Sequence, residues 1–280
     1  MSLTLTKLSP SLGRAAEGID LHKALDQGTA ESLRRALFDG LVLCIRGQSL
    51  KPPEYLAAMR TFGTPMKQTR IASRHGEIPE ITVLSSEDRD ELGDGKRIVV
   101  GAFWHSDDSY KRVPCSLTML YGVEVPPTGG DTQFTNMYAA YDDLSPSLKK
   151  RIADLKVVHK YDSSRKGTRV ATLRAEESSE LPDAVHPIVR THPETGRKAL
   201  YLNPNRMERI VGMEREESDR LLDELTRHAT QEKYQYRHKW RQGDILIWDN
   251  RCTMHKANAD YPEGSRRFMQ RIIVEGTVPV

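Results

Sequence analysis

Apolar and polar residues alternate along much of the chain from residue 80 onward, and this period of two is typical of half-buried strands. The alternation is clearest at Leu117, Met119, Tyr121, Val123 and Val125. Further strands are expected around Ile81 and Val83 and at 156–161, 186–192, 198–202, 234–240, 244–248 and 268–275. Turn sequences rich in proline and glycine separate several of these segments. Many short strands with few helices predict a β-sandwich or jelly roll.

Helical spacing of apolar residues is limited to four segments, at 29–39, 52–59, 146–155 and 214–228. Gly40 follows the first of them and is expected to end that helix, because glycine readily adopts the left-handed conformation found after helices. Residues 41–45 are expected to form a buried strand. We therefore expect a mainly β protein with flanking helices.

No internal repeat, low-complexity tract or linker divides the sequence, so residues 1–280 are expected to form a single domain. Residues 85–97 and 162–183 are charged and lack periodicity. Irregular segments of this length in compact domains are often lids or binding loops. We expect both segments to be mobile loops.

Charge and composition exclude several classes of protein. Lysine and arginine number 42 against 39 aspartate and glutamate, a net charge of +3 that gives no electrostatic footprint for nucleic acid. The longest apolar runs fall far short of the roughly 20 residues of a membrane span, and no secretory signal is visible. Three dispersed cysteines are typical of reduced thiols in a cytoplasm. We expect a cytoplasmic protein that binds neither nucleic acid nor membrane.

The strongest local chemical signal is the sequence Phe-Trp-His-Ser-Asp-Asp at 103–108. In a strand, residues two apart point to the same face, so His105 and Asp107 could bind one metal ion together. The alternative is an edge-strand histidine beside solvated aspartates. His255 follows the apolar strand at 245–248 and is a candidate third ligand, although a histidine taken alone is more often a core or surface residue.

A pair of arginines near the C-terminus is the second candidate feature. If residues 266–271 form a strand, Arg267 and Arg271 share a face with Met269. Burying two arginine side chains costs free energy unless each pairs with an anion. Guanidinium groups bind carboxylates well. The alternative is a strand with a solvated arginine face.

Together these segments resemble the taurine / 2,4-dichlorophenoxyacetate dioxygenase family, whose members depend on Fe(II) and 2-oxoglutarate. The matching features stand in order along nearly the whole chain. They are the segments 17–21, 46–48, 105–107, 126–132, 139–145 and 248–250, then His255, Arg266, Arg267 and Arg271. The resemblance implies a double-stranded β-helix core, which is the jelly-roll, cupin-like fold.

The resemblance also implies a role for each candidate residue. His105, Asp107 and His255 would be the catalytic and metal-binding triad that holds Fe(II), with three coordination sites open for cosubstrate and O2. Halogenating relatives carry a small residue where this chain has Asp107, so hydroxylation is favoured.

Three further residues resemble the family's binding groups for organic acids. Thr132 and Arg267 would bind the far carboxylate of 2-oxoglutarate. Arg271 would bind the acid group of an anionic substrate.

The implied function is hydroxylation of a small anionic organic substrate, with release of succinate and CO2. Hydroxylation beside an ether oxygen, a sulfonate or a sulfate ester gives a product that fragments. The polar groups that taurine-specific members use cannot be matched to residues 67–75 or to Gly101. The context of residues 252–257 is closer to the branch that cleaves aryloxyalkanoates, so a carboxylate is favoured, with sulfonates and sulfate esters as alternatives.

Two different classes of protein remain as alternatives. One is a zinc-dependent hydrolase that uses the same triad, although it would give no role to Thr132 or Arg267. The other is a non-catalytic jelly-roll binding protein. Family members commonly form dimers or tetramers, so a homo-oligomer is expected.

Overall fold

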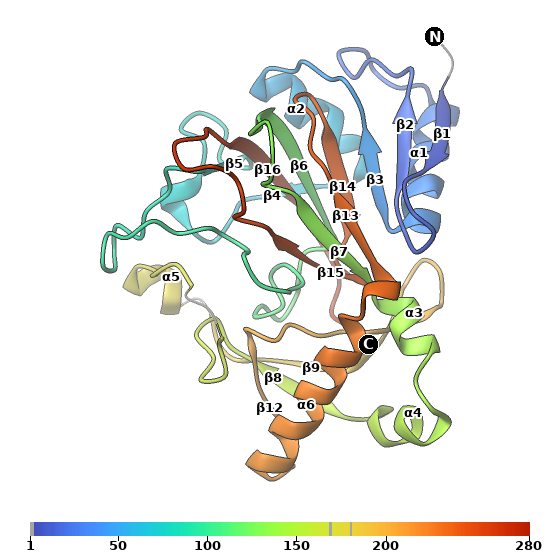
Figure 1. Ribbon diagram of the computed structural model, residues 1–280, viewed down its shortest axis with the longest axis vertical. Coiled ribbons are helices and arrows are strands. Elements are labelled where there is room, and N and C mark those ends of the chain that lie inside the picture. The colour runs from blue at the N-terminus through green and yellow to red at the C-terminus, as the bar shows by residue number, and fades with distance from the viewer. Residues whose placement is uncertain (1–2, 168–169, 180) are drawn as a thin grey trace.

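The structure is a computed structural model that describes residues 3–167, 170–179 and 181–280 (Figure 1). Its largest sheet has eight strands. In spatial order they are β1 (Thr4–Lys7), β2 (Arg14–Glu17), β3 (Val42–Ile45), β14 (Ile245–Asp249), β6 (Leu117–Glu124), β16 (Phe268–Val274) and β4 (Pro65–Met66), with β5 (Thr82–Ser85) also paired to β16. All pairs in this sheet are antiparallel except β2 with β3.

Three smaller sheets complete the strands. One holds β13 (Gln235–His238), β7 (Thr132–Asn136) and β15 (Thr253–Ala257), and another holds β12 (Met207–Ile210), β8 (Lys156–His159) and β9 (Ala184–Pro187). The last pairs β10 (Val189–Thr191) with β11 (Lys198–Leu200). Figure 1 shows β7, β13 and β15 beside the large sheet, with the β8–β9–β12 sheet at the opposite end of the molecule from the N-terminus.

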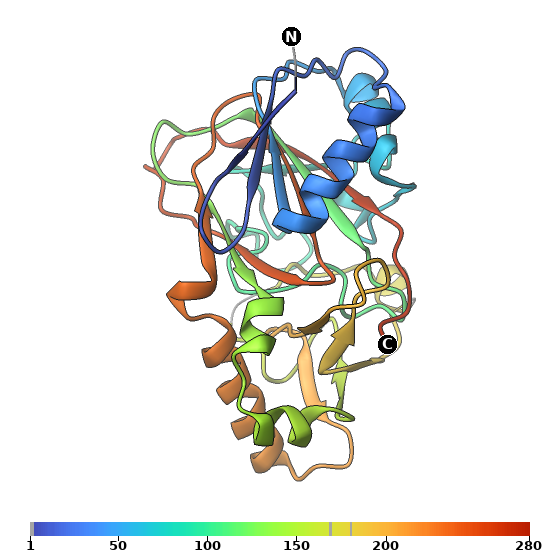
Figure 2. The same ribbon diagram turned by 90° about the vertical axis from the view of Figure 1, so that its right-hand side faces the viewer.

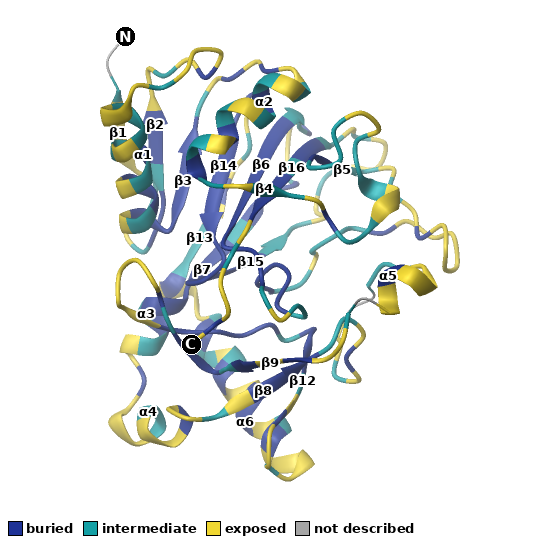
Figure 3. Ribbon diagram, turned by 180° about the vertical axis from the view of Figure 1, so that it is seen from behind, coloured by how far each residue is buried: buried dark blue, intermediate teal, exposed yellow. Residues whose placement is uncertain are grey.

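The helices are α1 (Gln27–Gly40), α2 (Pro52–Met59), α3 (Met137–Asp142), α4 (Pro146–Ile152), α5 (Ala175–Ser179) and α6 (Arg215–Ala229). Short 3-10 turns lie at Arg60–Phe62, Ile71–Ser73 and Glu232–Tyr234. Figure 2 shows α1 lying across the outer face of the large sheet. Figure 3 shows that the central strands of this sheet are buried while the helices expose one side, and the edge strand β1 is exposed.

The side chains of β14 are buried on both faces of the large sheet. Ile245 and Ile247 pack in the cluster beneath α1 and α2, whereas Leu246 and Trp248 pack in the cluster that faces the second sheet. Because successive side chains of a strand point to opposite faces, the strand must be apolar throughout. Met269 of β16 lies in the same inner cluster as Trp248.

The expected C-terminus of the first helix is wrong by one residue. Gly40 is the last residue of α1, and Leu41 adopts the left-handed conformation with φ of 63°. A Cβ at position 40 would lie 2.6 Å from Cγ of Arg14, so the glycine is required by the close approach of β2. Leu41 is buried in the core, which compensates the cost of its left-handed backbone.

Two other expectations need correction. The segment 186–192 is not one strand, because β9 ends at Pro187 and β10 begins at Val189 in a different sheet. Proline has no N–H to donate to a sheet and is a natural end for a strand. The segment 162–183 is not a plain loop, since it contains α5. Among the described residues, no helix is long and apolar enough to cross a membrane.

A buried ion pair holds the end of β14 to the β10–β11 region. The carboxylate of Asp249 accepts hydrogen bonds from Arg251 at 2.6 and 2.9 Å and lies 3.0 Å from Nε2 of His192. Burial alone would raise the pKa of Asp249, but Arg251 and His192 outweigh it and hold this pKa well below its usual value. The ionised carboxylate of Asp249 therefore stabilises the fold at pH values above its unfolded-state pKa of about 3.9. This stabilisation is lost progressively as the pH falls below that value.

We expect Asp249→Asn to lower the free energy of unfolding by about 3 kcal/mol, because the buried Arg251 would lose the Asp249 carboxylate and keep only the partly exposed Glu194, 2.7 Å away, as an acidic partner. Urea unfolding at neutral pH measures this change. The variant should also show a weaker loss of stability than the wild type when the pH is lowered below about 4. Asp154→Asn, at an exposed position, is the control and should unfold like the wild type. Unchanged stability of Asp249→Asn would contradict the prediction.

Candidate active site

His105 and His255 are brought together by their backbones. The N–H of His105 donates to the carbonyl of His255 at 3.0 Å, and the N–H of His255 donates back at 2.8 Å. This pair is an isolated antiparallel bridge, and its two imidazole rings have centroids 4.1 Å apart. His255 lies within β15, which pairs with β7, so the β13–β7–β15 sheet sets its position.

The expected strand geometry around the first ligand is wrong, although the convergence is correct. His105 is a single bridge residue, and the chain turns at Asp107 and Asp108 instead of continuing as a strand. Asp108 has φ of 56°, a conformation that aspartate tolerates better than most residues. The turn, and not strand alternation, directs the Asp107 carboxylate back toward the histidines. His255 likewise lies inside β15, and not at the end of the preceding strand.

The three candidate ligands form a compact donor set. One ligand atom from each of His105, Asp107 and His255 lies within 4.8 Å of the other two. Nε2 of His105 is 3.5 Å from Oδ1 of Asp107, and Nε2 of His255 is 3.6 Å from Oδ2. Nδ1 of His105 lies 2.7 Å from the carbonyl of Phe103, which fixes the ring so that Nε2 faces the carboxylate. Two imidazoles and one carboxylate fit a divalent metal such as Fe(II).

Two other clusters among the described residues satisfy the same spacing, but they are ion pairs. They are Cys44 with His238 and Asp244, and His192 with Asp249 and Cys252. Arg46 contacts the Asp244 carboxylate at 2.5 Å, and Arg251 contacts Asp249 at 2.6 Å. An arginine on the carboxylate makes these clusters poor cation sites.

The electrostatics of the triad favour metal-binding protonation states. Burial and the neighbouring His105 lower the pKa of His255 well below its usual value, so its imidazole is neutral. Burial would raise the pKa of Asp107, but the positive charge of Arg271, 3.4 Å away, opposes this, and the pKa is held well below its usual value. A neutral imidazole and an ionised carboxylate are the forms that bind metals.

A chain of hydrogen bonds orients the Asp107 carboxylate. The hydroxyl of Thr118 donates to Oδ2 at 2.6 Å and accepts from the Asn250 amide at 2.8 Å. Oδ1 of Asn250 accepts from the indole of Trp248 at 3.1 Å and from the backbone N–H of Asp107 at 3.2 Å. Neither Thr118 nor Asn250 was assigned a role from the sequence. The feature that could have pointed to Thr118 is a polar residue on the inner face of the otherwise apolar strand β6.

We expect Thr118→Val to weaken metal binding by about 10–100-fold, because the isosteric valine cannot orient the carboxylate of Asp107. A calorimetric titration with Mn(II) measures the affinity. Thr4→Val replaces an exposed threonine of the same sheet and should leave it unchanged. An unaltered affinity in Thr118→Val would remove this residue from the site.

A cavity beside the histidines contains the expected binding groups for an organic acid. Thr132, His105, His255, Arg267 and Arg271 all line it. The Thr132 hydroxyl accepts a hydrogen bond from the indole of Trp240 at 3.0 Å, which leaves its own hydrogen free to donate.

Arg267 is the main positive group of this cavity. Its side chain donates from Nε to the carbonyl of Gly130 at 3.3 Å. Burial lowers the pKa of Arg267, and Tyr261 and Asp131 oppose that shift. Arginine stays charged in proteins, so this guanidinium is suited to a carboxylate ligand.

The turn that carries Gly130 is built from two glycines for a steric reason. Gly129 and Gly130 have φ of 73° and 70°. A Cβ on Gly129 would lie 2.5 Å from the carbonyl oxygen of Asp260, and one on Gly130 would lie 2.9 Å from Pro126. The turn therefore brings its backbone against the 260 region and places Gly130 beside Arg267.

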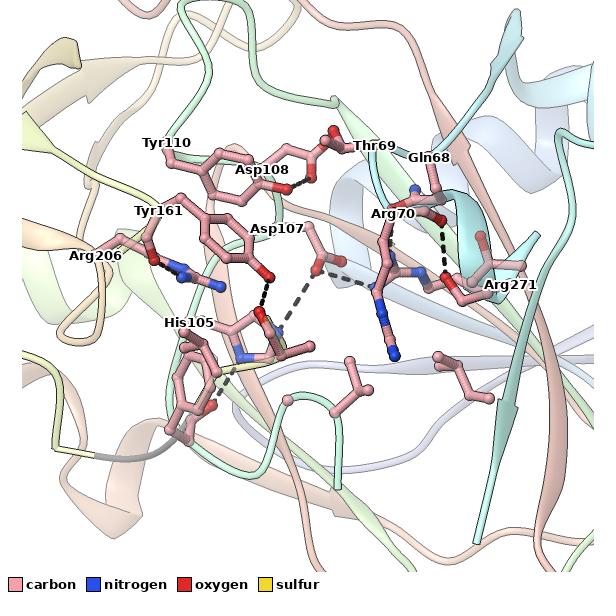
Figure 4. A pocket seen from close by; sticks show the side chains of 18 of the residues that line it. Gln68, Thr69, Arg70, His105, Asp107, Asp108, Tyr110, Tyr161, Arg206 and Arg271 are labelled. Carbon is pink, nitrogen blue, oxygen red and sulfur yellow. Dashed lines mark hydrogen bonds and ion pairs between the residues drawn. The ribbon is translucent and has the colours of Figure 1, made fainter. Parts of the chain in front are cut away.

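A larger cavity opens on the other side of the triad and is seen in Figure 4. Arg271 reaches it between two partners: Nη1 is 3.4 Å from Oδ1 of Asp107, and Nη2 donates to Oε1 of Gln68 at 2.5 Å. The structure thus brings all six sequence-predicted residues to one place. Gln68 was not identified from the sequence, because nothing local marks a glutamine in an irregular segment.

The two irregular segments 85–97 and 162–183 contact one another. Thr172 donates to the Asp90 carboxylate from its backbone N–H at 2.9 Å and from its hydroxyl at 3.0 Å. Glu177 accepts from the backbone N–H groups of Ile71 and Arg174 at 2.7 and 2.8 Å. Val170, Ala171 and Leu173 line the cavity, so the described part of the second segment forms one of its walls.

The arrangement of two imidazoles and a carboxylate beside a cavity lined by arginines fits a metal-dependent oxygenase. Comparison with known proteins agrees. The family model described as "Taurine catabolism dioxygenase TauD, TfdA family" matches residues 4–273. The chain belongs to this family, and it is an Fe(II)/2-oxoglutarate-dependent dioxygenase.

Individual relatives match almost the whole chain. The 2,4-dichlorophenoxyacetate dioxygenase of Cupriavidus pinatubonensis is 32% identical over 280 residues, which cover 97% of each chain. An alkylsulfatase of Acinetobacter baylyi is 32% identical over 284 residues, covering 99% of this chain and 86% of the relative. The crystal structure of AAD-2 in complex with Mn(II) and N-oxalylglycine has a TM-score of 0.83 at 32% identity, covering 100% of this chain and 99% of that one.

These matches bear on the fold and on the alternatives. The protein is a mixed α/β molecule of many strands that matches structures of this family. The alternatives of a zinc-dependent hydrolase and of a non-catalytic binding protein are thereby excluded.

Proposed function

We propose that this enzyme hydroxylates a small anionic organic substrate, most readily a carboxylate such as an aryloxyalkanoate, and releases succinate and CO2. The single observation that carries this proposal is the position of Arg271 and Asp107, where a guanidinium lines the cavity beside the metal-binding triad. A substrate acid group held there would present its neighbouring C–H bond to the metal. We also propose that residues 1–280 form one catalytic domain with the double-stranded β-helix core of the family.

The metal site is proposed to consist of His105, Asp107 and His255. Bound Fe(II), with 2-oxoglutarate and O2, supplies the oxidising power that removes hydrogen from a C–H bond. Thr118 and Asn250 hold the carboxylate ligand in place. The protein contributes the orientation of the reacting groups.

The cosubstrate is proposed to bind in the cavity lined by Thr132 and Arg267. The free hydrogen of the Thr132 hydroxyl would donate to the far carboxylate of 2-oxoglutarate, and Arg267 would pair with it. The ligand named with AAD-2, N-oxalylglycine, also carries two carboxylates, which supports an acid-binding role for this cavity.

Sulfonates and sulfate esters are the second candidate substrates, because the relatives include an alkylsulfatase. The carboxylate is preferred because the 2,4-dichlorophenoxyacetate relative is matched over nearly its full length. In either case, hydroxylation beside the heteroatom gives a product that fragments without another catalytic group.

Two measurements test the proposal in sequence. Addition of Fe(II) and 2-oxoglutarate without oxygen is expected to give a weak visible charge-transfer band, which His255→Ala should lose. A screen of aryloxyalkanoates, sulfonates and sulfate esters for succinate formation then identifies the substrate class. Iron binding without the band would reject the proposed cosubstrate site, and turnover only with sulfate esters or sulfonates would reject the carboxylate.

A further inference from the structure

The larger cavity carries positive groups on two sides of the triad. Figure 4 shows Arg206 beside Tyr110 and Tyr161 on one side, and Gln68, Arg70 and Arg271 on the other, with Asp107 between. All of these residues line the same cavity. Of the three arginines among them, the proposed function assigns a role only to Arg271.

Arg206 is held between two aromatic rings, and among the described residues it pairs with no acidic group. Its guanidinium lies 4.2 Å from the ring centre of Tyr161 and 5.1 Å from that of Tyr110, and Nη1 donates to the Tyr161 carbonyl. The residue is 9% exposed. Within residues 3–167, 170–179 and 181–280, no carboxylate forms an ion pair with it. The aromatic rings stabilise its charge from the faces, and they leave its edge available to a ligand.

The nearest acidic candidate in the cavity wall is already occupied. Asp108 accepts a hydrogen bond from Tyr110 at 3.0 Å and pairs with Lys111 at 2.7 Å. The hydroxyl of Tyr161 donates to the carbonyl of Ala171 at 2.8 Å. Both tyrosines are thus fixed by their own hydrogen bonds, so Arg206 is oriented before any ligand binds.

The side of the cavity that carries Arg271 also contains a second arginine, Arg70. Arg70 donates from Nη2 to the carbonyl of Arg89 at 3.4 Å, and its Nε is buried without a hydrogen-bond partner. No described carboxylate pairs with it. Arg271 shares the Asp107 carboxylate with the proposed metal site. An unpaired charge in such a cavity is costly unless a ligand neutralises it.

We propose that the substrate carries two acidic groups, one bound by Arg271 and Arg70 and the other bound by Arg206, so that the carbon between them lies at the metal. The inference rests on the proposed function and narrows its substrate class from an organic acid to an organic diacid. A monoacid would satisfy only one side of the cavity. Arg206 is then the residue that determines specificity for the second acid group.

The test compares probes that differ by one carboxylate. Phenoxyacetate is the monoacid, and 2-, 3- and 4-carboxyphenoxyacetate are diacids with three spacings. Each is titrated calorimetrically into the protein loaded with Fe(II) and saturating 2-oxoglutarate under anaerobic conditions. We expect at least one diacid to bind about 10-fold or more tightly than phenoxyacetate, which corresponds to about 1.4 kcal/mol.

Substitution of the arginine isolates its role. Arg206→Met keeps the length of the side chain and should remove the preference for the diacid, while phenoxyacetate affinity changes less than about 2-fold. Arg209→Met, at an exposed position three residues later, is the control and should keep the preference.

The outcomes separate this inference from the proposed function. Equal affinity of all four probes for the wild type, or an equal loss for monoacid and diacid in Arg206→Met, would overturn it, because Arg206 would then be structural. Loss of the charge-transfer band with 2-oxoglutarate instead rejects the cosubstrate site. Probe binding by calorimetry does not depend on that band.

Discussion

His255→Ala is expected to abolish turnover and to prevent stoichiometric binding of Fe(II). The substitution removes one of only two imidazoles in the donor set and leaves Asp107 without the group 3.6 Å away. We expect at least about a 1,000-fold loss of succinate formation, equivalent to about 4 kcal/mol of activation free energy. Metal binding is measured by calorimetry with Fe(II) under anaerobic conditions, and turnover by succinate release.

The control for this variant is the same substitution at an exposed histidine. His22 is 45% exposed in its side chain and lies far along the chain from the triad, so His22→Ala should bind metal like the wild type. Circular dichroism of both variants excludes unfolding as the cause. A His255→Ala protein that retains one tightly bound Fe(II) would show that the metal is held elsewhere.

Arg267→Ala is expected to raise the KM for 2-oxoglutarate by roughly 100-fold, about 2.7 kcal/mol, because a charge-assisted pair with the far carboxylate is lost. The remaining Thr132 hydroxyl can donate only one hydrogen bond to that carboxylate. Succinate formation as a function of 2-oxoglutarate concentration measures the change, and the charge-transfer band provides the affinity directly.

The neighbouring arginine is a close control. Arg266 is 68% exposed and pairs with Glu124 at 3.3 Å, on the surface of the sheet. Surface ion pairs contribute little, so Arg266→Ala should leave the KM unchanged. If Arg267→Ala and Arg266→Ala behave alike, Arg267 is not the carboxylate-binding residue.

Local periodicity predicted the strands that matter most for the site. The alternation from Leu117 to Val125 corresponds to β6, and the segment 268–275 corresponds to β16. Because alternation also assigns faces, it placed Arg267 and Arg271 on one face with Met269, and both arginines line the cavity that contains Thr132. Burial of a strand face is a local requirement that the chain records at every second position.

Periodicity was less informative where a residue serves a distant contact. Gly40 was expected to follow the first helix, yet it ends that helix because Arg14 of another strand packs against it. Asp107 was expected on a strand with His105, yet it lies on a turn. A contact with a remote segment leaves no repeating pattern in the sequence around the residue.

By itself, the sequence predicted the family and the reaction class through its resemblance to known dioxygenases, and it singled out six residues that the structure brings together. The order of several modest motifs along the chain sufficed for this, because no one of them was distinctive alone. Only the tertiary structure revealed the bridge between His105 and His255, the support of Asp107 by Thr118, and the second positive side at Arg206. These depend on contacts between segments far apart in the chain, such as the bond between Arg271 and Gln68 across 203 residues. Long-range packing decides such contacts, and local sequence patterns carry no record of it.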